Sequence, residues 1–311
     1  MDIRRQDPIT RPQAVDHGTV RGICAALCGR YACLRPAVAG QSLCGRELPL
    51  LVLSSPEKDG PTEQRVLLAA AFHGQEWLTA LVALRLCEEL CRAVTADLPL
   101  CGISPAALRR RQIFFLPLVN PDGVEIARYG SAAAGEYADF VAANGGDTPG
   151  QWQANARGVD LNHNFNAGWR QMQAFLAQNP VYARPGARRY PGTSPESEPE
   201  TRAVTDLCRR YAFRHAVALH SQGEEIYWRY GEDTPPQSRL MADVLGAAAG
   251  YTVADPAGFA SHGGFKDWFI RCFHRPGFTV EWGKGENPLP VAAFEAMYGK
   301  AREMLLLSAV L

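Results

Sequence analysis

The sequence predicts an α/β protein with layered strands and helices, and three observations lead to this fold class. Short apolar runs bounded by turn or polar residues, typical of strands, recur along the chain. Segments with apolar residues at helical spacing lie between them, an alternation typical of layered α/β domains. No linker, repeat or low-complexity segment interrupts the 311 residues. We therefore expect residues 1–311 to form a single domain.

The strands are predicted where short apolar runs occur, at residues 50–53, 66–72, 112–118, 216–219, 226–230 and 278–281. Helical spacing predicts helices over residues 77–94, 236–249, 264–273 and 291–311. Asn120-Pro121-Asp122-Gly123 predicts a turn after the third strand. Ser197 and Glu200 predict a capping box that starts a helix ending near residue 211.

Two segments lack this regular pattern. Residues 130–196 are rich in Gly, Asn, Pro and Arg, and they predict a long loop-rich excursion. Such long loops in compact domains are usually functional or disordered. Residues 1–20 are polar, and we expect them to form a loosely attached N-terminal segment. They contain no apolar core of a signal peptide.

Composition excludes several classes of partner. Lys plus Arg equals Asp plus Glu at 32 each, so the net charge lacks the positive excess of a nucleic-acid binder. No basic amphipathic stretch or membrane-length apolar run is present, so no membrane partner is expected. Nine scattered cysteines without an export signal predict reduced thiols and a cytoplasmic location. The cysteines four residues apart, at 24/28 and 87/91, are interpreted as core residues because no second zinc-finger pair follows.

Three predicted strands end in side chains that can bind metal or protons. His73 follows one strand, with Glu76 at the start of the next helix. His220 ends another strand, and Glu281 ends a third. In open α/β sheets, sites gather at the carboxyl ends of strands. Two imidazoles and a carboxylate suit zinc, and a second carboxylate nearby could take a proton from water.

Each of these residues also has an ordinary structural explanation. His73 could cap its turn, and Glu76 could favour the first turn of a helix. His220 could be a hydrogen-bonded core residue. Glu281 could form an ion pair, since a buried acid is costly without a partner.

The order of these segments resembles that of the zinc carboxypeptidase superfamily, the carboxypeptidase A-like enzymes. Residues 118–123 (LVNPDG) and 158–165 (GVDLNHNF) strengthen the resemblance, and Gly45-Arg46 adds a weaker match. The resemblance implies a three-layer α/β/α fold with a central twisted mixed sheet of about eight strands. It also implies a zinc peptidase domain with one Zn²⁺ per chain.

The roles implied by the resemblance are specific. His73, Glu76 and His220 would be the zinc ligands. Glu281 would be the general base that takes a proton from zinc-activated water and passes it to the leaving amine. Asn162 would help to hold a substrate carboxylate.

Three departures from the family pattern affect substrate recognition. His163 stands where the family has an arginine that grips a C-terminal carboxylate, and a neutral imidazole cannot form the same bidentate contact. Gln153 aligns with the arginine that stabilises the oxyanion, and Arg157 lies nearby as a substitute. Phe259 aligns with a mobile tyrosine, whose role is lost or passes to His262.

One branch of the superfamily matches better, namely the peptidases that cut γ-D-glutamyl bonds to diamino acids in bacterial cell-wall peptides. The resemblance lies in residues 220–228 (HSQGEEIYW), 263–269 (GGFKDWF), 275–281 (RPGFTVE) and 285–290 (GENPLP). It implies a muropeptide substrate cleaved between γ-D-Glu and meso-diaminopimelate. Arg157 or His163 could meet its carboxylates. Its ammonium could be met by one of four acids: Glu224, Glu225, Asp255 or Asp267.

The leading hypothesis is therefore a cytoplasmic zinc peptidase acting on small cell-wall peptides as a monomer or small homo-oligomer. A conventional metallocarboxypeptidase or an N-acyl amino acid deacylase is the alternative enzyme. A catalytically inactive peptide-binding module is the alternative from another class, motivated by the missing arginines and tyrosine. Retention of His73, Glu76, His220 and Glu281 argues against it.

Overall fold

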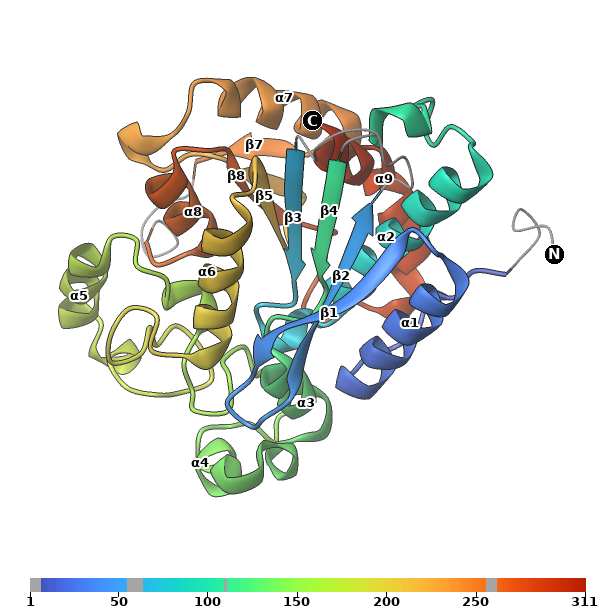
Figure 1. The fold of residues 1–311 in the computed structure, drawn as a ribbon. Coiled ribbons are helices and arrows are strands. Elements are labelled where there is room, and N and C mark those ends of the chain that lie inside the picture. Colours follow the sequence, from blue (N-terminus) through green and yellow to red (C-terminus); the bar gives the residue numbers. More distant parts are fainter. Residues whose placement is uncertain (1–6, 55–63, 109–110, 256–261) are drawn as a thin grey trace.

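The computed structural model describes residues 7–54, 64–108, 111–255 and 262–311. These residues build one eight-stranded mixed sheet with the order β1-β2-β4-β3-β5-β8-β6-β7 (Figure 1). The four central strands, β4, β3, β5 and β8, run parallel, whereas β2 and β6 join them antiparallel. The strands are β1 Leu34–Gln41, β2 Glu47–Ser54, β3 Gln64–Ala70, β4 Arg111–Leu116, β5 His215–His220, β6 Glu225–Tyr227, β7 Thr252–Ala254 and β8 Gly277–Glu281.

Helices cover both faces of the sheet, so the predicted three-layer α/β/α fold is confirmed (Figure 1). Along β3, Val66 and Leu68 pack in the core with one set of helices, and the intervening Leu67 packs on the other side. Burial on both faces is typical of parallel strands. The first set is α1 His17–Arg30, α2 Leu78–Ala96, α7 Gln237–Ala249 and α9 Phe294–Val310; the second is α6 Pro199–Tyr211 and α8 Phe265–Phe273.

The predicted loop-rich excursion contains several helices. Val141 and Trp152 of this excursion form a small core with Ile126 of the helix that precedes it. The predicted turn at residues 120–123 also starts a helix, since Asn120 accepts a hydrogen bond from Gly123 N and Pro121 takes the first helical position. This helix is α3 Pro121–Tyr129, and the helices of the excursion are η4 Ser131–Tyr137, α4 Ala138–Ala143, η5 Leu161–His163, α5 Trp169–Gln178 and η6 Pro180–Tyr182. The other 3₁₀ turns are η2 Gly74–Glu76, η3 Pro105–Leu108, η7 Gly231–Asp233 and η9 Val291–Ala293.

Two local predictions were wrong. Glu198, not Ser197, precedes α6, and no side chain caps that helix. Glu200 instead accepts a hydrogen bond from Leu43 N. The N-terminal segment is not loosely attached over residues 7–20, because Thr10 is buried and both its N and Oγ1 donate to Glu88.

No helix in the described ranges is long and apolar enough to cross a membrane. All nine cysteines are free. Cys24, Cys87 and Cys91 are buried in the core that α1 and α2 share with the sheet, as expected for core residues.

A buried histidine at the start of β5 predicts a pH-dependent stability. Burial lowers the pKa of His215 from 6.5 to about 4, although its Nε2 contacts Ser308 O at 2.7 Å. Because the unfolded chain binds a proton at higher pH than the folded chain, His215 stabilises the fold fully above pH about 6.5, and this contribution is lost as the pH falls towards about 4. The loss should be about 2 kcal/mol between pH 7 and 4.5.

Urea unfolding of the wild type and His215→Gln at both pH values checks this prediction. The variant should lose less stability on acidification, by roughly that amount. An identical pH dependence of the two proteins would contradict it.

Candidate metal centre

Four candidate site residues meet at one edge of the sheet because they follow three neighbouring parallel strands. His73 comes after β3 and precedes the turn η2, which contains Glu76. His220 is the last residue of β5, and Glu281 is the last residue of β8. His220 and Glu281 are direct partners in the register of β5 and β8.

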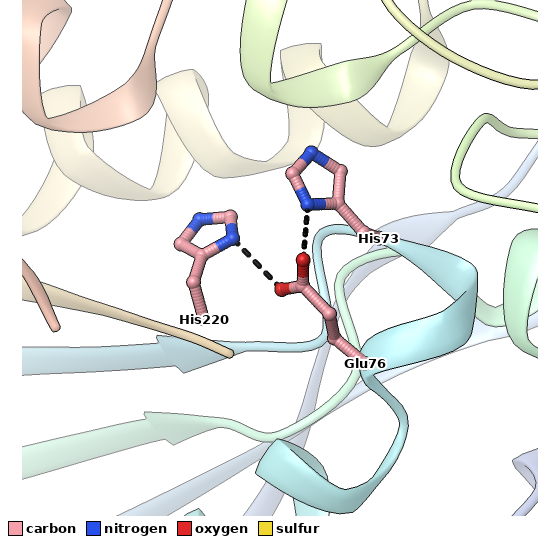
Figure 2. Close-up of side chains that lie close together, drawn as sticks. All are labelled: His73, Glu76 and His220. Atoms are coloured by element: carbon pink, nitrogen blue, oxygen red, sulfur yellow. Dashed lines mark hydrogen bonds and ion pairs between the residues drawn. The ribbon is translucent and has the colours of Figure 1, made fainter. Parts of the chain in front are cut away.

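Both histidines point a ring nitrogen at the carboxylate of Glu76 (Figure 2). His73 Nδ1 lies 2.7 Å from Glu76 Oε1, and His220 Nδ1 lies 3.0 Å from Oε2. One donor atom from each of the three residues lies within 4.8 Å of the other two. The three predicted metal ligands are therefore brought together.

A glycine allows the tight turn that carries Glu76. A Cβ atom on Gly74 would lie 2.2 Å from Gly123 O and 2.7 Å from Trp152 O. Gly74 N donates to Gln153 O at 3.0 Å. Only glycine fits between these backbones, so the turn is fixed by packing against α3 and the segment around Trp152.

The electrostatics of the cluster favour a cation. Burial alone would raise the pKa of Glu76, but the charges of His73 and His220 hold it below its usual range. Burial raises the pKa of Glu281, and the negative charge of Glu76 raises it further. A divalent cation among these groups would compensate the two carboxylates.

The donor set fits zinc. Two imidazole nitrogens and a carboxylate are zinc ligands, and three protein ligands leave a position open for chemistry. The second ring nitrogen of His73, Nε2, lies 3.1 Å from Asp160 Oδ1. A carboxylate behind a histidine in this way orients the ring for metal binding.

Asp160 is the neighbour of the candidate ligands that sequence reasoning missed, although it lies inside the quoted 158–165 motif. It is buried and also accepts hydrogen bonds from Arg189 N and Asn162 N. Burial alone would raise the pKa of Asp160, but the charge of His73 and the hydrogen bonds that the carboxylate accepts hold it well below the usual range. A polar residue just before a short turn was the available signal, yet its partner His73 is 87 positions away.

Replacing Asp160 by asparagine should weaken zinc binding about 10- to 100-fold, since removing the carboxylate behind a ligand loosens the orientation of the ring. Competition with a chromogenic chelator measures the zinc affinity. The matched control is Asp147→Asn, which removes an exposed carboxylate that accepts from Ser131 N. Equal zinc affinities of the two variants would rule out this role of Asp160.

The two candidates for oxyanion stabilisation have different surroundings. Gln153 lies next to η2, the turn that contains Glu76, since its backbone carbonyl accepts a hydrogen bond from Gly74 N. Arg157 instead pairs with Glu198, with Nη2 2.9 Å and Nε 3.2 Å from the same carboxylate oxygen. Its guanidinium is thus already engaged by a buried acid.

The other predicted substrate residues lie around η5. Asn162 Oδ1 accepts from Phe265 N, which leaves its NH₂ group as the donor for a carboxylate. His163 Nδ1 lies 3.1 Å from His262 O, so these two residues are neighbours. Burial lowers the pKa of His163, in agreement with the neutral imidazole expected there. Phe259 lies outside the described residues.

Glu224 points elsewhere. Its carboxylate pairs with Lys300 of α9 at 2.6 Å. Helix α9 covers one face of the sheet, whereas α8 and η5 lie on the other face. The contact with α9 therefore directs the Glu224 carboxylate away from η5.

The fold and the cluster together are those of a zinc hydrolase. A model of the zinc carboxypeptidase family matches residues 30–303, and the chain belongs to this family. The family prediction made from the sequence is thereby confirmed.

Similar proteins agree with this assignment. The chain is 34% identical over 280 residues to gamma-D-glutamyl-L-diamino acid endopeptidase 1 of Lysinibacillus sphaericus, a match that covers 89% of this chain and 67% of that protein. It is 35% identical over 245 residues to the protein YqgT of Bacillus subtilis (strain 168), covering 78% and 64%. It thus spans about two thirds of the length of these relatives. The crystal structure of thrombin activatable fibrinolysis inhibitor superposes with a TM-score of 0.76 at 18% identity, covering 99% of this chain and 79% of that one, which shows the fold.

Proposed function

We propose that this chain is a zinc-dependent peptidase that hydrolyses the amide bond between γ-D-glutamate and a diamino acid in small bacterial cell-wall peptides. The observation that carries the proposal is the convergence of His73, Glu76 and His220 one strand away from Glu281. The 34% identity to a gamma-D-glutamyl-L-diamino acid endopeptidase supports the substrate class.

The three converging side chains are proposed to hold one zinc ion, with His73 oriented by Asp160. Bound zinc supplies Lewis acidity that activates water and polarises a carbonyl. Glu281 takes the proton of the attacking water at its carboxylate and then gives it to the departing amine. Gln153 donates a side-chain hydrogen bond to the oxyanion.

Substrate carboxylates are proposed to meet the NH₂ group of Asn162 and the imidazoles of His163 and His262. The neutrality of His163 disfavours ordinary C-terminal trimming, which relies on a charged bidentate grip. Free cysteines throughout are in keeping with the proposed cytoplasmic location.

The test is to offer the zinc-loaded protein the tripeptides L-Ala-γ-D-Glu-diaminopimelate and L-Ala-γ-D-Glu-L-Lys and to measure release of L-Ala-D-Glu. No release from either peptide would refute the substrate assignment. A panel of C-terminal dipeptides and N-acyl amino acids, assayed in parallel, would reveal a conventional carboxypeptidase or a deacylase.

A further inference from the structure

We infer that Glu225 is the specificity residue that binds the distal ammonium of the leaving diamino acid, with Tyr227 holding its carboxylate in place. This inference rests on the proposed function and identifies which of the four candidate acids recognises the substrate's positive charge.

The register of the sheet places Glu225 in line with the reacting groups. His220, Glu281 and Glu225 are direct partners across three neighbouring strands, β5, β8 and β6. Directly paired residues point to the same face of a sheet. The residues next to them, Leu219, Val280 and Ile226, all pack in the core on the opposite face.

Glu225 therefore stands on the same face as the proposed base, one strand further from His220. A Cβ atom added to Gly223 would lie 3.6 Å from Glu225 Cγ and 3.6 Å from Glu281 Cβ. The side chains of Glu225 and Glu281 therefore flank this glycine. Neighbouring strands are about 4.8 Å apart, a distance that the four-carbon stem of lysine can span. A leaving amine at Glu281 would thus bring its distal ammonium to Glu225.

The contacts of the Glu225 carboxylate distinguish it from the carboxylates of the other three acids. Among the described residues its carboxylate contacts only a neutral donor, the hydroxyl of Tyr227, at 2.6 Å. Tyr227 is two residues along β6 and so lies on the same face. This hydrogen bond fixes the carboxylate without neutralising it.

Each of the other acids already has a cationic partner. Glu224 pairs with Lys300 on the opposite layer. The exposed Asp255 lies 3.6 Å from Arg229, and the buried Asp267 pairs with Lys266 beside it in sequence. Glu225 is thus the acid in this set whose charge is left for an external cation.

The experiment compares two peptides that differ only in the distal amine, L-Ala-γ-D-Glu-L-Lys and L-Ala-γ-D-Glu-L-norleucine. The wild type should prefer the lysine peptide. In Glu225→Gln, kcat/KM for the lysine peptide should fall about 10- to 100-fold, since a charged hydrogen bond is lost. Cleavage of the norleucine peptide should stay unchanged, which also shows that the variant is folded.

Tyr227→Phe should give a smaller loss, for the lysine peptide alone. The matched control is Glu295→Gln, which removes a carboxylate paired with Arg85 at 2.8 Å on the opposite layer. It should retain the preference of the wild type. Equal cleavage of both peptides by the wild type, or unchanged preference in Glu225→Gln, would overturn the inference while leaving the proposed function intact.

If neither peptide is cleaved, the proposed function fails, and calorimetry decides the inference separately. L-Lysine should bind the zinc-loaded wild type more tightly than L-norleucine does, and this difference should vanish in Glu225→Gln. Equal binding of the two amino acids to the wild type would overturn the inference on its own.

Discussion

Replacing His220 by alanine is expected to leave the purified protein with less than about a tenth of an equivalent of zinc and to lower kcat/KM at least about a thousandfold. A catalytic zinc site has three protein ligands, and His220 supplies one of only two imidazoles in this cluster. The Lewis acidity that would be lost contributes several kcal/mol, and each 1.4 kcal/mol corresponds to about a tenfold change in rate.

Metal analysis after purification without chelator measures the zinc content, and the tripeptide assay measures the rate. The matched control is His274→Asn, because His274 is exposed and lies 3.9 Å from Asp233, outside the cluster. Asparagine also tolerates the left-handed backbone at this position, where φ is 49°. The control should keep one zinc and the activity of the wild type.

Wild-type protein stripped by a chelator provides an independent arm. Its activity should vanish and return after addition of one equivalent of zinc. Full activity of the stripped protein, or of His220→Ala, would show that the three converging side chains do not form the catalytic centre. Full zinc content with no activity towards any peptide would instead favour a binding module.

The position of these candidate residues was predictable because they lie where strands end. Reactive side chains after apolar runs cannot be core residues without a partner, so His73, His220 and Glu281 stood out. Their convergence follows from a general property of parallel strands, whose carboxyl ends share one edge. The exact order of the strands did not have to be known.

Elements without such a pattern were missed. In β1, Pro36 and Gly40 obscure the strand signal, and an edge strand tolerates them because it needs hydrogen bonds on one side only. In α1, Gly18, Gly22 and Gly29 lower helix propensity, and burial against the sheet compensates for it. β7 has only three residues and depends on pairing with β6.

Long-range partners were the other limit. The role of the weakly matching Gly45-Arg46 pair is visible only in the structure. Arg46 Nη1 pairs with buried Asp122 at 2.6 Å and so ties the start of β2 to the start of α3. Arg157 likewise forms an ion pair with Glu198, 41 residues away. Spacing along the chain cannot show which charged side chains already have a partner of opposite charge. These pairings are the reason for proposing Gln153 rather than Arg157 as the oxyanion donor. They are also the reason for proposing Glu225 rather than Glu224 as the acid that binds the ammonium.

Glu281→Gln is expected to keep its zinc and lose activity, with kcat lowered about 10²- to 10⁴-fold. The amide has nearly the same size and can still form hydrogen bonds, but it cannot accept a proton from water at neutral pH. Glu281 ends β8 beside His220, and its backbone is held there by the strand pairing rather than by a flexible loop. The effect should therefore come from lost proton transfer and not from lost structure.

Glu281→Asp provides the graded comparison. It retains a proton acceptor but withdraws it by one methylene, and a misplacement of about 1 Å can cost about a hundredfold in rate. Its activity should lie between those of the wild type and Glu281→Gln, while all three proteins bind one zinc. Glu281→Gln with full zinc and more than about a tenth of wild-type kcat would assign the base to another residue. Because Glu225 stands one strand away on the same face, Glu225→Gln measured in parallel shows whether that carboxylate substitutes for Glu281 or acts only on the substrate's charge.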